Sequence, residues 1–120
     1  MVLVVAALLG AVVAPAALAL SERCGTLPCK GTNHKDRLGE RKGNGVADRI
    51  YGLGGKDTLR ADRYGNDRDS VYGGSGNDFI NTRDGDSKYT IDAGGGFDTC
   101  YLDIGEANKI KGCDSTQETD

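Results

Sequence analysis

Residues 73–81 read Gly-Gly-Ser-Gly-Asn-Asp-Phe-Ile-Asn, a glycine-rich turn followed by an aspartate and then, two residues later, a large apolar residue. The segments 52–59 and 94–100 repeat this order, and the first glycines of the three segments lie 21 residues apart. Weaker copies lie at 31–39, 43–51 and 64–72. A glycine-rich unit that recurs at a fixed period indicates a repeat architecture rather than a conventional globular domain.

The apolar residue of each copy predicts how the chain coils. Along the series, the spacings alternate at 12, 9, 12, 9, 11 and 9 residues: Leu38, Ile50, Leu59, Val71, Ile80, Ile91 and Cys100. A chain with two short strands per coil places every second member in the same sheet. One inner face then holds Leu38, Leu59, Ile80 and Cys100, and the other holds Ile50, Val71 and Ile91. Each strand of about three residues is too short to be stable alone, so stacking of the coils must stabilise it.

The composition excludes several classes of protein. After residue 19 the chain has 101 residues, of which 28 are apolar and only 15 are Leu, Ile, Val or Phe. That is too little to line a conventional core of this size. The net charge of −3 is small for a disordered chain, and 14 Asp stand against 4 Glu beside 19 Gly. A helical bundle, a transmembrane bundle and a basic nucleic-acid-binding protein are therefore excluded, and the folding energy must come from outside a large core.

The N-terminal segment predicts export. Residues 1–19 read MVLVVAALLGAVVAPAALA, contain no charged residue and end in the small-residue pattern Ala17-Leu18-Ala19. This pattern is typical of a secretory signal peptide that is cleaved after Ala19, although no Lys or Arg precedes the apolar run. The alternative is a membrane anchor, since the run is about long enough to span a bilayer. Its many alanines, with one Gly and one Pro, favour the cleaved signal, so we expect a secreted chain that leaves the membrane.

Four cysteines agree with export. They are Cys24, Cys29, Cys100 and Cys113. An even number in a small exported chain favours two disulfides, and of the three possible connectivities the local pairs Cys24–Cys29 and Cys100–Cys113 are preferred. A zinc site with four thiolate ligands is the alternative, but the chain has no Cys-x-x-Cys pair and the expected compartment is oxidising.

The repeat resembles a known family. Residues 73–81 match every position of the nonapeptide Gly-Gly-x-Gly-x-Asp-x-U-x, where U is large and apolar, and residues 52–60 differ only at Leu53 and Gly54. Over about residues 24–114 the chain resembles the RTX, or hemolysin-type, calcium-binding repeat proteins, in particular the small secreted ones of actinobacterial type.

This resemblance implies an all-β fold, a parallel β-roll. Such a roll is a right-handed β-solenoid with two sheets of short strands and Gly/Asp-rich turns. The expected organisation is a signal peptide, a Cys-flanked cap, a calcium-binding roll, and a disulfide-closed cap whose end, from Ser115, is a frayed tail. The corresponding ranges are 1–19, 20–30, 31–101 and 102–120.

The chemistry available to such turns is calcium coordination. Ca²⁺ prefers six to eight oxygen ligands at about 2.3–2.6 Å. Glycines allow several carbonyls of one turn to point inward, and the following aspartate supplies negative charge. The resemblance implies one ion between turns 52–57 and 73–78 and another between turns 73–78 and 94–98. The implied ligands are the carboxylates of Asp57, Asp78 and Asp98 and the carbonyls of Gly52, Gly54, Gly73, Ser75, Gly94 and Gly95.

The longer turns on the opposite edge are a weaker candidate site. They carry three extra residues, and Tyr89 stands where the next aspartate is expected. Asp48 and Asp69 are the candidate ligands of one ion there. Two groups are expected to have other roles. The first consists of turn-forming residues, Asp62, Asp67, Asp84 and Asp86. The second consists of outward-facing tyrosines that pack over strand edges, Tyr51, Tyr72 and Tyr101.

The aspartates have an alternative explanation as a solvated face. Residues 31–101 contain 12 acidic and 11 basic residues, so many carboxylates could pair with neighbouring Arg. A solvated face, however, does not require Asp at a fixed phase behind glycines. Stacked carboxylates repel one another when no cation is present. We therefore expect a largely disordered calcium-free chain that folds when it binds Ca²⁺.

Two other functions are alternatives to calcium binding. The sequence does not favour an enzyme, because its only histidine, His34, lies in the most degenerate copy and no nucleophile–base pairing is evident. The second is an extracellular adhesion or surface-interaction module in which calcium is only structural and the partner is a protein or a glycan. Nothing in the sequence excludes it, and it is compatible with calcium binding.

Overall fold

The computed structural model describes residues 21–23, 28–39, 47–62, 68–85 and 88–119. Within them the fold is all-β, and no α-helix is present in these ranges. The predicted signal peptide at 1–19 and Cys24 lie outside the described residues. Nowhere in the described part of the chain does a helix have the length and hydropathy of a membrane span.

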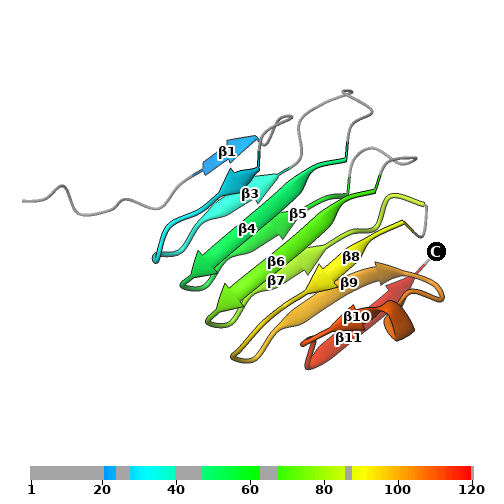
Figure 1. Cartoon of the computed structure of the whole chain (residues 1–120). Coiled ribbons are helices and arrows are strands. Elements are labelled where there is room, and N and C mark those ends of the chain that lie inside the picture. The colour runs from blue at the N-terminus through cyan, green and yellow to red at the C-terminus, as the bar shows by residue number, and fades with distance from the viewer. Residues whose placement is uncertain (1–20, 24–27, 40–46, 63–67, 86–87, 120) are drawn as a thin grey trace, which may run out of the picture.

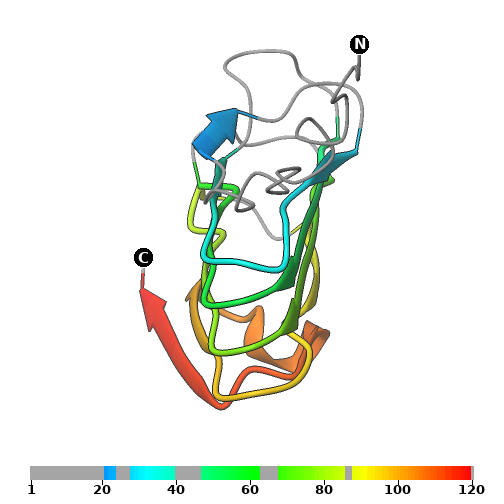
Figure 2. The same ribbon diagram turned by 90° about the vertical axis from the view of Figure 1, so that its left-hand side faces the viewer.

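The chain coils so that successive strands alternate between two parallel sheets, which Figure 2 shows facing each other (Figures 1 and 2). Sheet A contains, in order, β1 (Ser21–Arg23), β3 (Arg37–Gly39), β5 (Thr58–Arg60), β7 (Phe79–Asn81), β9 (Thr99–Asp103) and β11 (Ser115–Thr119). Sheet B contains β2 (Cys29–Lys30), β4 (Arg49–Gly54), β6 (Ser70–Ser75), β8 (Thr90–Asp92) and β10 (Ile110–Lys111). A short 3₁₀ helix, Ala107–Lys109, precedes β10. The predicted β-roll is confirmed.

The strand register confirms the two predicted inner faces. In sheet A, Leu38 is paired with Leu59, Leu59 with Ile80, and Ile80 with Cys100. In sheet B, Ile50 is paired with Val71, and Val71 with Ile91. The alternating spacing therefore reports the coil directly, because the chain must complete one strand of each sheet per turn.

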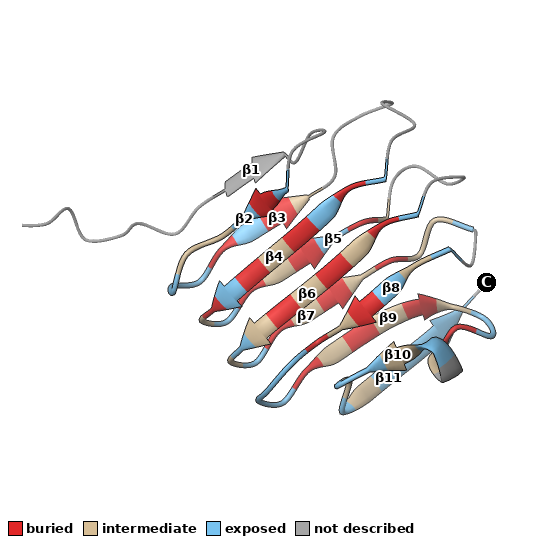
Figure 3. Ribbon diagram, viewed as in Figure 1, coloured by how far each residue is buried: buried red, intermediate tan, exposed pale blue. Residues whose placement is uncertain are grey.

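The core is a thin layer between the sheets. From β2 to β9 burial alternates along the strands, as Figure 3 shows, with inward residues buried and their neighbours partly or fully exposed, whereas β10 and β11 have no buried residue. The buried apolar residues are Cys29, Leu38, Ile50, Leu59, Ala61, Val71, Ile80, Ile91, Ala93, Cys100 and Leu102. On the outer face of sheet B, Tyr51 and Tyr72 stack with ring centroids 4.8 Å apart, in agreement with their predicted packing role.

The C-terminal segment is more regular than the sequence indicates. Ser115–Thr119 forms β11, which pairs with β9 over five residues, so the prediction of a frayed tail was wrong. The pairing depends on backbone hydrogen bonds, since the Asp98 carbonyl accepts from the N–H groups of Asp114 and Ser115. The predicted disulfide Cys100–Cys113 is present and joins β9 to the last coil.

The oxidation state of the cysteines tests the predicted disulfides against the alternative of a zinc site. Cys29 is also disulfide-bonded, whereas its predicted partner Cys24 lies outside the described residues. Oxidised cysteines cannot serve as thiolate ligands, which removes the four-thiolate zinc site. A disulfide also indicates an oxidising compartment.

Candidate metal centre

The site is built where strands of sheet B turn into strands of sheet A, here called the short-turn edge. Each of these turns ends in an aspartate that immediately precedes a sheet A strand. We call this set the aspartate column: Asp36, Asp57, Asp78, Asp98 and Asp114. The backbone N–H of each of the first four donates to a carboxylate oxygen of the next, at 2.8, 2.9, 2.8 and 2.8 Å. One carboxylate oxygen per coil therefore ties adjacent coils together.

The first four members of the column are buried and Asp114 is exposed, and the burial of these four argues against the solvated-face explanation. Asp57, Asp78 and Asp98 are 1%, 3% and 0% exposed. The ion pairs formed among described residues, Arg60–Asp62 and Lys111–Asp92, lie outside the column. Burying an ionised carboxylate is costly unless a proton, a cation or hydrogen bonds compensate the charge.

The three predicted ligands differ from the first member of the column in the hydrogen bonding of their second carboxylate oxygen. Oδ2 of Asp57, Asp78 and Asp98 is buried and accepts no hydrogen bond from any described residue. In Asp36 the same oxygen accepts from the N–H and the hydroxyl group of Thr32, which stands in the first turn at the position of Leu53 in the second. Within the column, the unsatisfied oxygens therefore belong to the three carboxylates that the sequence singled out.

Glycines allow these oxygens to lie close to the backbone of the turns. A Cβ added to Gly52 would lie 2.5 Å from Asp57 Oδ2 and 2.4 Å from the carbonyl oxygen of Gly73 in the next coil. At Gly73 the corresponding distances are 2.6 Å to Asp78 Oδ2 and 2.2 Å to the carbonyl oxygen of Ala93. In each case a carboxylate oxygen of one coil and a carbonyl oxygen of the next converge on one small volume. Hard oxygens converging in this way suit Ca²⁺.

The electrostatics of the column disfavour ionised carboxylates in the absence of a cation. Burial, with smaller contributions from the carboxylates of Asp78 and Asp36, raises the pKa of Asp57 from 3.8 to about 6, against the hydrogen bond from the Asp36 N–H. Burial is also the main cause that raises the pKa of Asp78 and that of Asp98. A bound cation would reverse this preference by stabilising the charged form.

The predicted carbonyl ligands fall into two registers. Gly52 and Gly73 adjoin the carboxylates, as described above, whereas Gly54, Ser75 and Gly95 stack on one another further along the turns. In that second register the Ser75 carbonyl accepts from the Gly55 N–H at 3.0 Å, and the Gly95 carbonyl accepts from the Gly76 N–H at 2.9 Å. These backbone hydrogen bonds link the turns and use one lone pair of each carbonyl.

The third turn is displaced by one residue from the 21-residue period. Gly94 lies against Gly74, and Ala93 occupies the place beside Gly73. Gly94 therefore does not correspond to Gly52 and Gly73, and the carbonyl beside the Asp78 carboxylate belongs to Ala93. The column accommodates the shift, since Asp98 follows Asp78 by 20 residues and still accepts its N–H.

On the opposite edge, strands of sheet A turn into strands of sheet B, and we call this the long-turn edge. The structure brings Asp48 and Asp69 together there. Both are 1% exposed, and the Asp48 N–H donates to Asp69 Oδ1 at 2.8 Å. The pairing of Thr90 with Ser70 places Tyr89 where a third aspartate would stand, and its hydroxyl group donates to the Ala61 carbonyl. This edge therefore ends after two aspartates, which makes it a shorter candidate site.

The remaining candidates have other environments. Asp62 binds the guanidinium group of Arg60 and the amide group of Asn81. The N–H groups of Asp84 and Gly85 donate to Asp103 Oδ2, so this turn is held by a residue of β9. Asp67 and Asp86 lie outside the described residues. His34 is exposed and stands at the position of the turn glycine Gly55.

Sequence reasoning missed two members of the column, Asp36 and Asp114. Asp36 lies 21 residues before Asp57, so its phase was visible although the glycines of its turn are largely replaced. Asp114 was hidden because the last turn is shorter, which places it only 16 residues after Asp98.

Across the described ranges, no three His, Cys, Asp or Glu side chains form a group that could hold a metal by themselves. A cation at the short-turn edge would have to be held by backbone carbonyls as well as by carboxylates. A scan against protein-family models gave no match for the chain, and neither did comparisons with curated proteins and with solved structures.

Proposed function

We propose that this chain is a secreted calcium-binding protein that folds as it binds Ca²⁺ at the short-turn edge. The observation that carries the proposal is the state of Asp57, Asp78 and Asp98. Each buries a carboxylate oxygen without a hydrogen bond, and the oxygens of Asp57 and Asp78 lie so close to Gly52 and Gly73 that a Cβ would not fit there. A proton or a cation is needed there, and a site made of hard oxygens favours a hard cation.

The residues that would hold the ions are the three carboxylates together with carbonyl groups of the adjoining coils. The nearest carbonyls are those of Gly73 and Ala93, which converge on the carboxylates of Asp57 and Asp78. The ion would supply positive charge between stacked carboxylates that otherwise repel one another. Asp48 and Asp69 are proposed as a separate, weaker site on the long-turn edge.

Folding and binding are coupled in this proposal. The core contains only 11 buried apolar residues, two of them alanines, within the described coils. Such a thin core offers little to offset the burial of the aspartate column. Because the ligands come together only when coils stack, the free energy of calcium binding becomes free energy of folding.

The proposed location follows from the same chemistry. The disulfide supports an oxidising compartment, and residues 1–19 are proposed as a cleaved signal peptide. Low cytosolic calcium would keep the chain unfolded for export, and the extracellular ion would then trigger folding. We propose an ion-binding protein and not an enzyme.

The test is calcium titration calorimetry and far-UV circular dichroism on the oxidised chain from residue 20, with Asp78→Asn as the decisive variant. An asparagine keeps an Oδ1 atom that accepts the Asp57 N–H, while it removes the charge. We expect calcium affinity to fall by about tenfold or more, because the central carboxylate adjoins both neighbouring turns. Asp92→Asn is the matched control, since Asp92 lies on the outer face of sheet B and pairs with Lys111.

The proposal is contradicted by either of two results. One is a calcium-stripped wild-type chain that already has the full β-sheet spectrum and takes up no calcium. The other is an Asp78→Asn chain that binds calcium as tightly as Asp92→Asn.

A further inference from the structure

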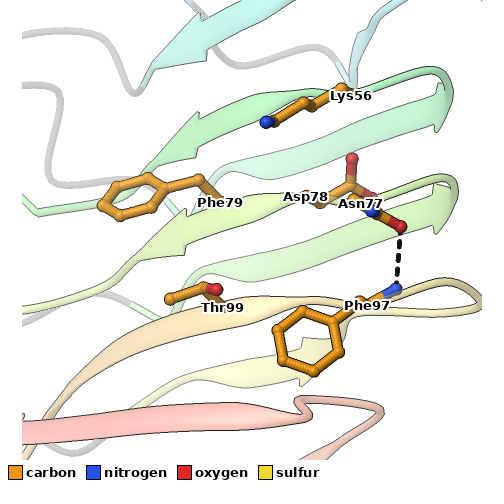
Figure 4. A pocket seen from close by; sticks show the side chains of 6 residues that line it. All are labelled: Lys56, Asn77, Asp78, Phe79, Phe97 and Thr99. Carbon is orange, nitrogen blue, oxygen red and sulfur yellow. Dashed lines mark hydrogen bonds between the residues drawn. The ribbon is translucent and has the colours of Figure 1, made fainter.

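A pocket on the sheet A side of the short-turn edge shares only Asp78 with the proposed calcium site. It has a volume of about 260 Å³. Its lining comes from three consecutive coils and consists of Lys56, Asn77, Asp78, Phe79, Phe97 and Thr99 (Figure 4). Of these residues, only Asp78 belongs to the aspartate column, so the other five require a separate explanation.

Two phenyl rings border this pocket. Phe97 is 60% exposed, although it is one of the few large apolar residues of the chain. A second aromatic group lies on sheet A, where Phe79 contacts Tyr101 with ring centroids 4.9 Å apart, and the guanidinium group of Arg83 covers Tyr101 at 4.4 Å. Exposed aromatic side chains of this kind are characteristic of contact sites.

Polar groups lie between and beside the rings. The Asn77 side-chain oxygen accepts the Phe97 N–H at 2.9 Å, which fixes the amide and leaves its NH₂ group as a donor toward a ligand (Figure 4). Lys56 is exposed and forms no ion pair with any described residue. Thr99 adds a hydroxyl group to the lining of the pocket. Apart from Asp78, which is only 3% exposed and belongs to the aspartate column, the pocket therefore combines an apolar face with neutral donors and one cation.

This combination matches the chemistry of an acidic sugar. The C–H face of a pyranose ring can be buried on a phenyl ring, while its hydroxyl groups need hydrogen-bond partners and its carboxylate needs a cation. The pocket is smaller than a typical site for a drug-sized ligand, and so suits a single ring. An acidic peptide side chain would satisfy Lys56 but would leave the exposed face of Phe97 uncovered.

We propose that this pocket binds a uronic acid residue of an acidic glycan. Phe97 and Phe79 would contact the ring, Asn77 and Thr99 its hydroxyl groups, and Lys56 its carboxylate. The inference rests on the stacked coils, and on the proposed calcium function only in so far as calcium is needed to stack them. It also specifies the partner that a surface-interaction module of this fold would have.

The test is calorimetric titration of trigalacturonate into the oxidised, calcium-saturated chain, with both solutions dialysed against the same calcium buffer. The uncharged galactose trisaccharide and hexaglutamate are titrated in parallel. We expect trigalacturonate to bind more tightly than either. Phe97→Ala should weaken its binding by about tenfold, since most of a phenyl contact is lost. Lys56→Gln should weaken it by about fivefold and leave binding of the neutral sugar unchanged.

Lys30→Gln is the matched control, because Lys30 is an exposed lysine of β2 in the other sheet. Phe97→Tyr retains the ring and should retain binding. The inference is overturned if hexaglutamate binds and trigalacturonate does not, or if Phe97→Ala and Lys56→Gln bind the sugar like Lys30→Gln. Calcium uptake measured on the same samples separates the two proposals. A chain that takes up calcium but no sugar defeats this inference alone, whereas a chain that folds and binds sugar without calcium defeats only the proposed function.

Discussion

At the scale of single residues, the two oxygens of each central aspartate have different roles. In Asp57, Asp78 and Asp98, one oxygen accepts the backbone N–H of the preceding aspartate, and the other is buried without a hydrogen bond. The first role needs only an acceptor, and asparagine would fill it. The second role needs charge compensation, which asparagine would not require. Aspartate at these positions is therefore best explained by a ligand rather than by the hydrogen-bonded column alone.

Leu53 is strained in the turn it occupies. Its φ of 77° lies in the left-handed region, where the equivalent residues Gly74 and Gly94 have φ of 99° and 94°. A left-handed conformation costs a residue with a Cβ about 1–2 kcal/mol. Since Leu53 is 44% exposed and buries little, Leu53→Gly should stabilise the calcium-bound chain by about 0.5–1 kcal/mol in urea denaturation. Gly74→Leu is the reciprocal control and should destabilise it, because its Cβ would lie 2.2 Å from the Leu53 carbonyl oxygen. A urea denaturation midpoint of Leu53→Gly below that of the wild-type chain would contradict this account.

The raised pKa of Asp57 predicts an unusual pH dependence. Its folded-state pKa of about 6 exceeds the ordinary value of 3.8, so folding favours the protonated acid. The resulting stabilisation is present below about pH 4 and is lost as pH rises through about 6. A calcium-stripped chain should therefore gain β-structure on acidification from pH 7 to about pH 4.5, the reverse of ordinary acid denaturation. Calcium affinity should fall over the same range because protons compete for the carboxylates.

Circular dichroism of resin-stripped protein across this range, without a carboxylate chelator, measures the first effect. Asp78→Asn is the comparison, since it removes one titrating member of the column and should flatten the dependence. Loss of β-structure on acidification of the stripped wild-type chain would show that the buried carboxylates do not control its folding.

At the scale of the elements, each turn depends on a glycine without a Cβ as much as on its carboxylate. Gly52 and Gly73 have ordinary backbone angles, and their lack of a Cβ is what allows oxygens of two coils to converge. Gly95 lies in the same kind of turn, but an added Cβ there would meet nothing within 4 Å. Two glycines of one edge thus differ in whether the site needs them.

This difference gives a matched pair of variants. Gly73→Ala places a methyl group 2.2 Å from the Ala93 carbonyl oxygen and 2.6 Å from Asp78 Oδ2, so it should destabilise the roll by about 1–3 kcal/mol and abolish calcium uptake at that turn. Gly95→Ala should change stability by less than about 0.5 kcal/mol. Calcium calorimetry and urea denaturation of both variants make the comparison. Equal calcium affinity in the two would show that the space beside Gly73 is not part of the site.

The elements also show which features can be inferred from sequence. The sheet assignment of Leu59 and Ile80 follows from spacing alone, because a coil with two strands per turn has no other way to bury them. The predicted alignment of the third turn with the second was wrong by one residue, because Gly94, Gly95 and Gly96 have no side chains that distinguish one alignment from another. β11 was missed because Ser115–Thr119 contains no apolar residue and is joined to the sheet through its backbone. Burial of the carboxylates was likewise not readable from the sequence, since it arises only when coils stack.

At the scale of the whole molecule, the fold is nearly one-dimensional. Each strand pairs only with its counterparts in the preceding and following coils, and sheets A and B are held by the thin core between them. The stability of such an array is approximately the sum of the stabilities of its repeats and interfaces. A cation between two coils strengthens one interface, so calcium binding in neighbouring turns should be cooperative.

The largest expected change is in size. An unfolded chain of about 100 residues has a radius of gyration of about 30 Å, against about 13 Å for a compact fold. The Cys100–Cys113 disulfide closes a separation of only 13 residues, so it cannot compact the calcium-free chain. Small-angle X-ray scattering should therefore record a fall of about twofold in the radius of gyration when millimolar calcium is added to the stripped chain. Magnesium at the same concentration should have little effect, because Mg²⁺ requires stricter octahedral geometry and retains its waters. Equal compaction by magnesium would mean that screening of the aspartate column suffices to stack the coils, and a compact stripped chain would mean that no cation is required.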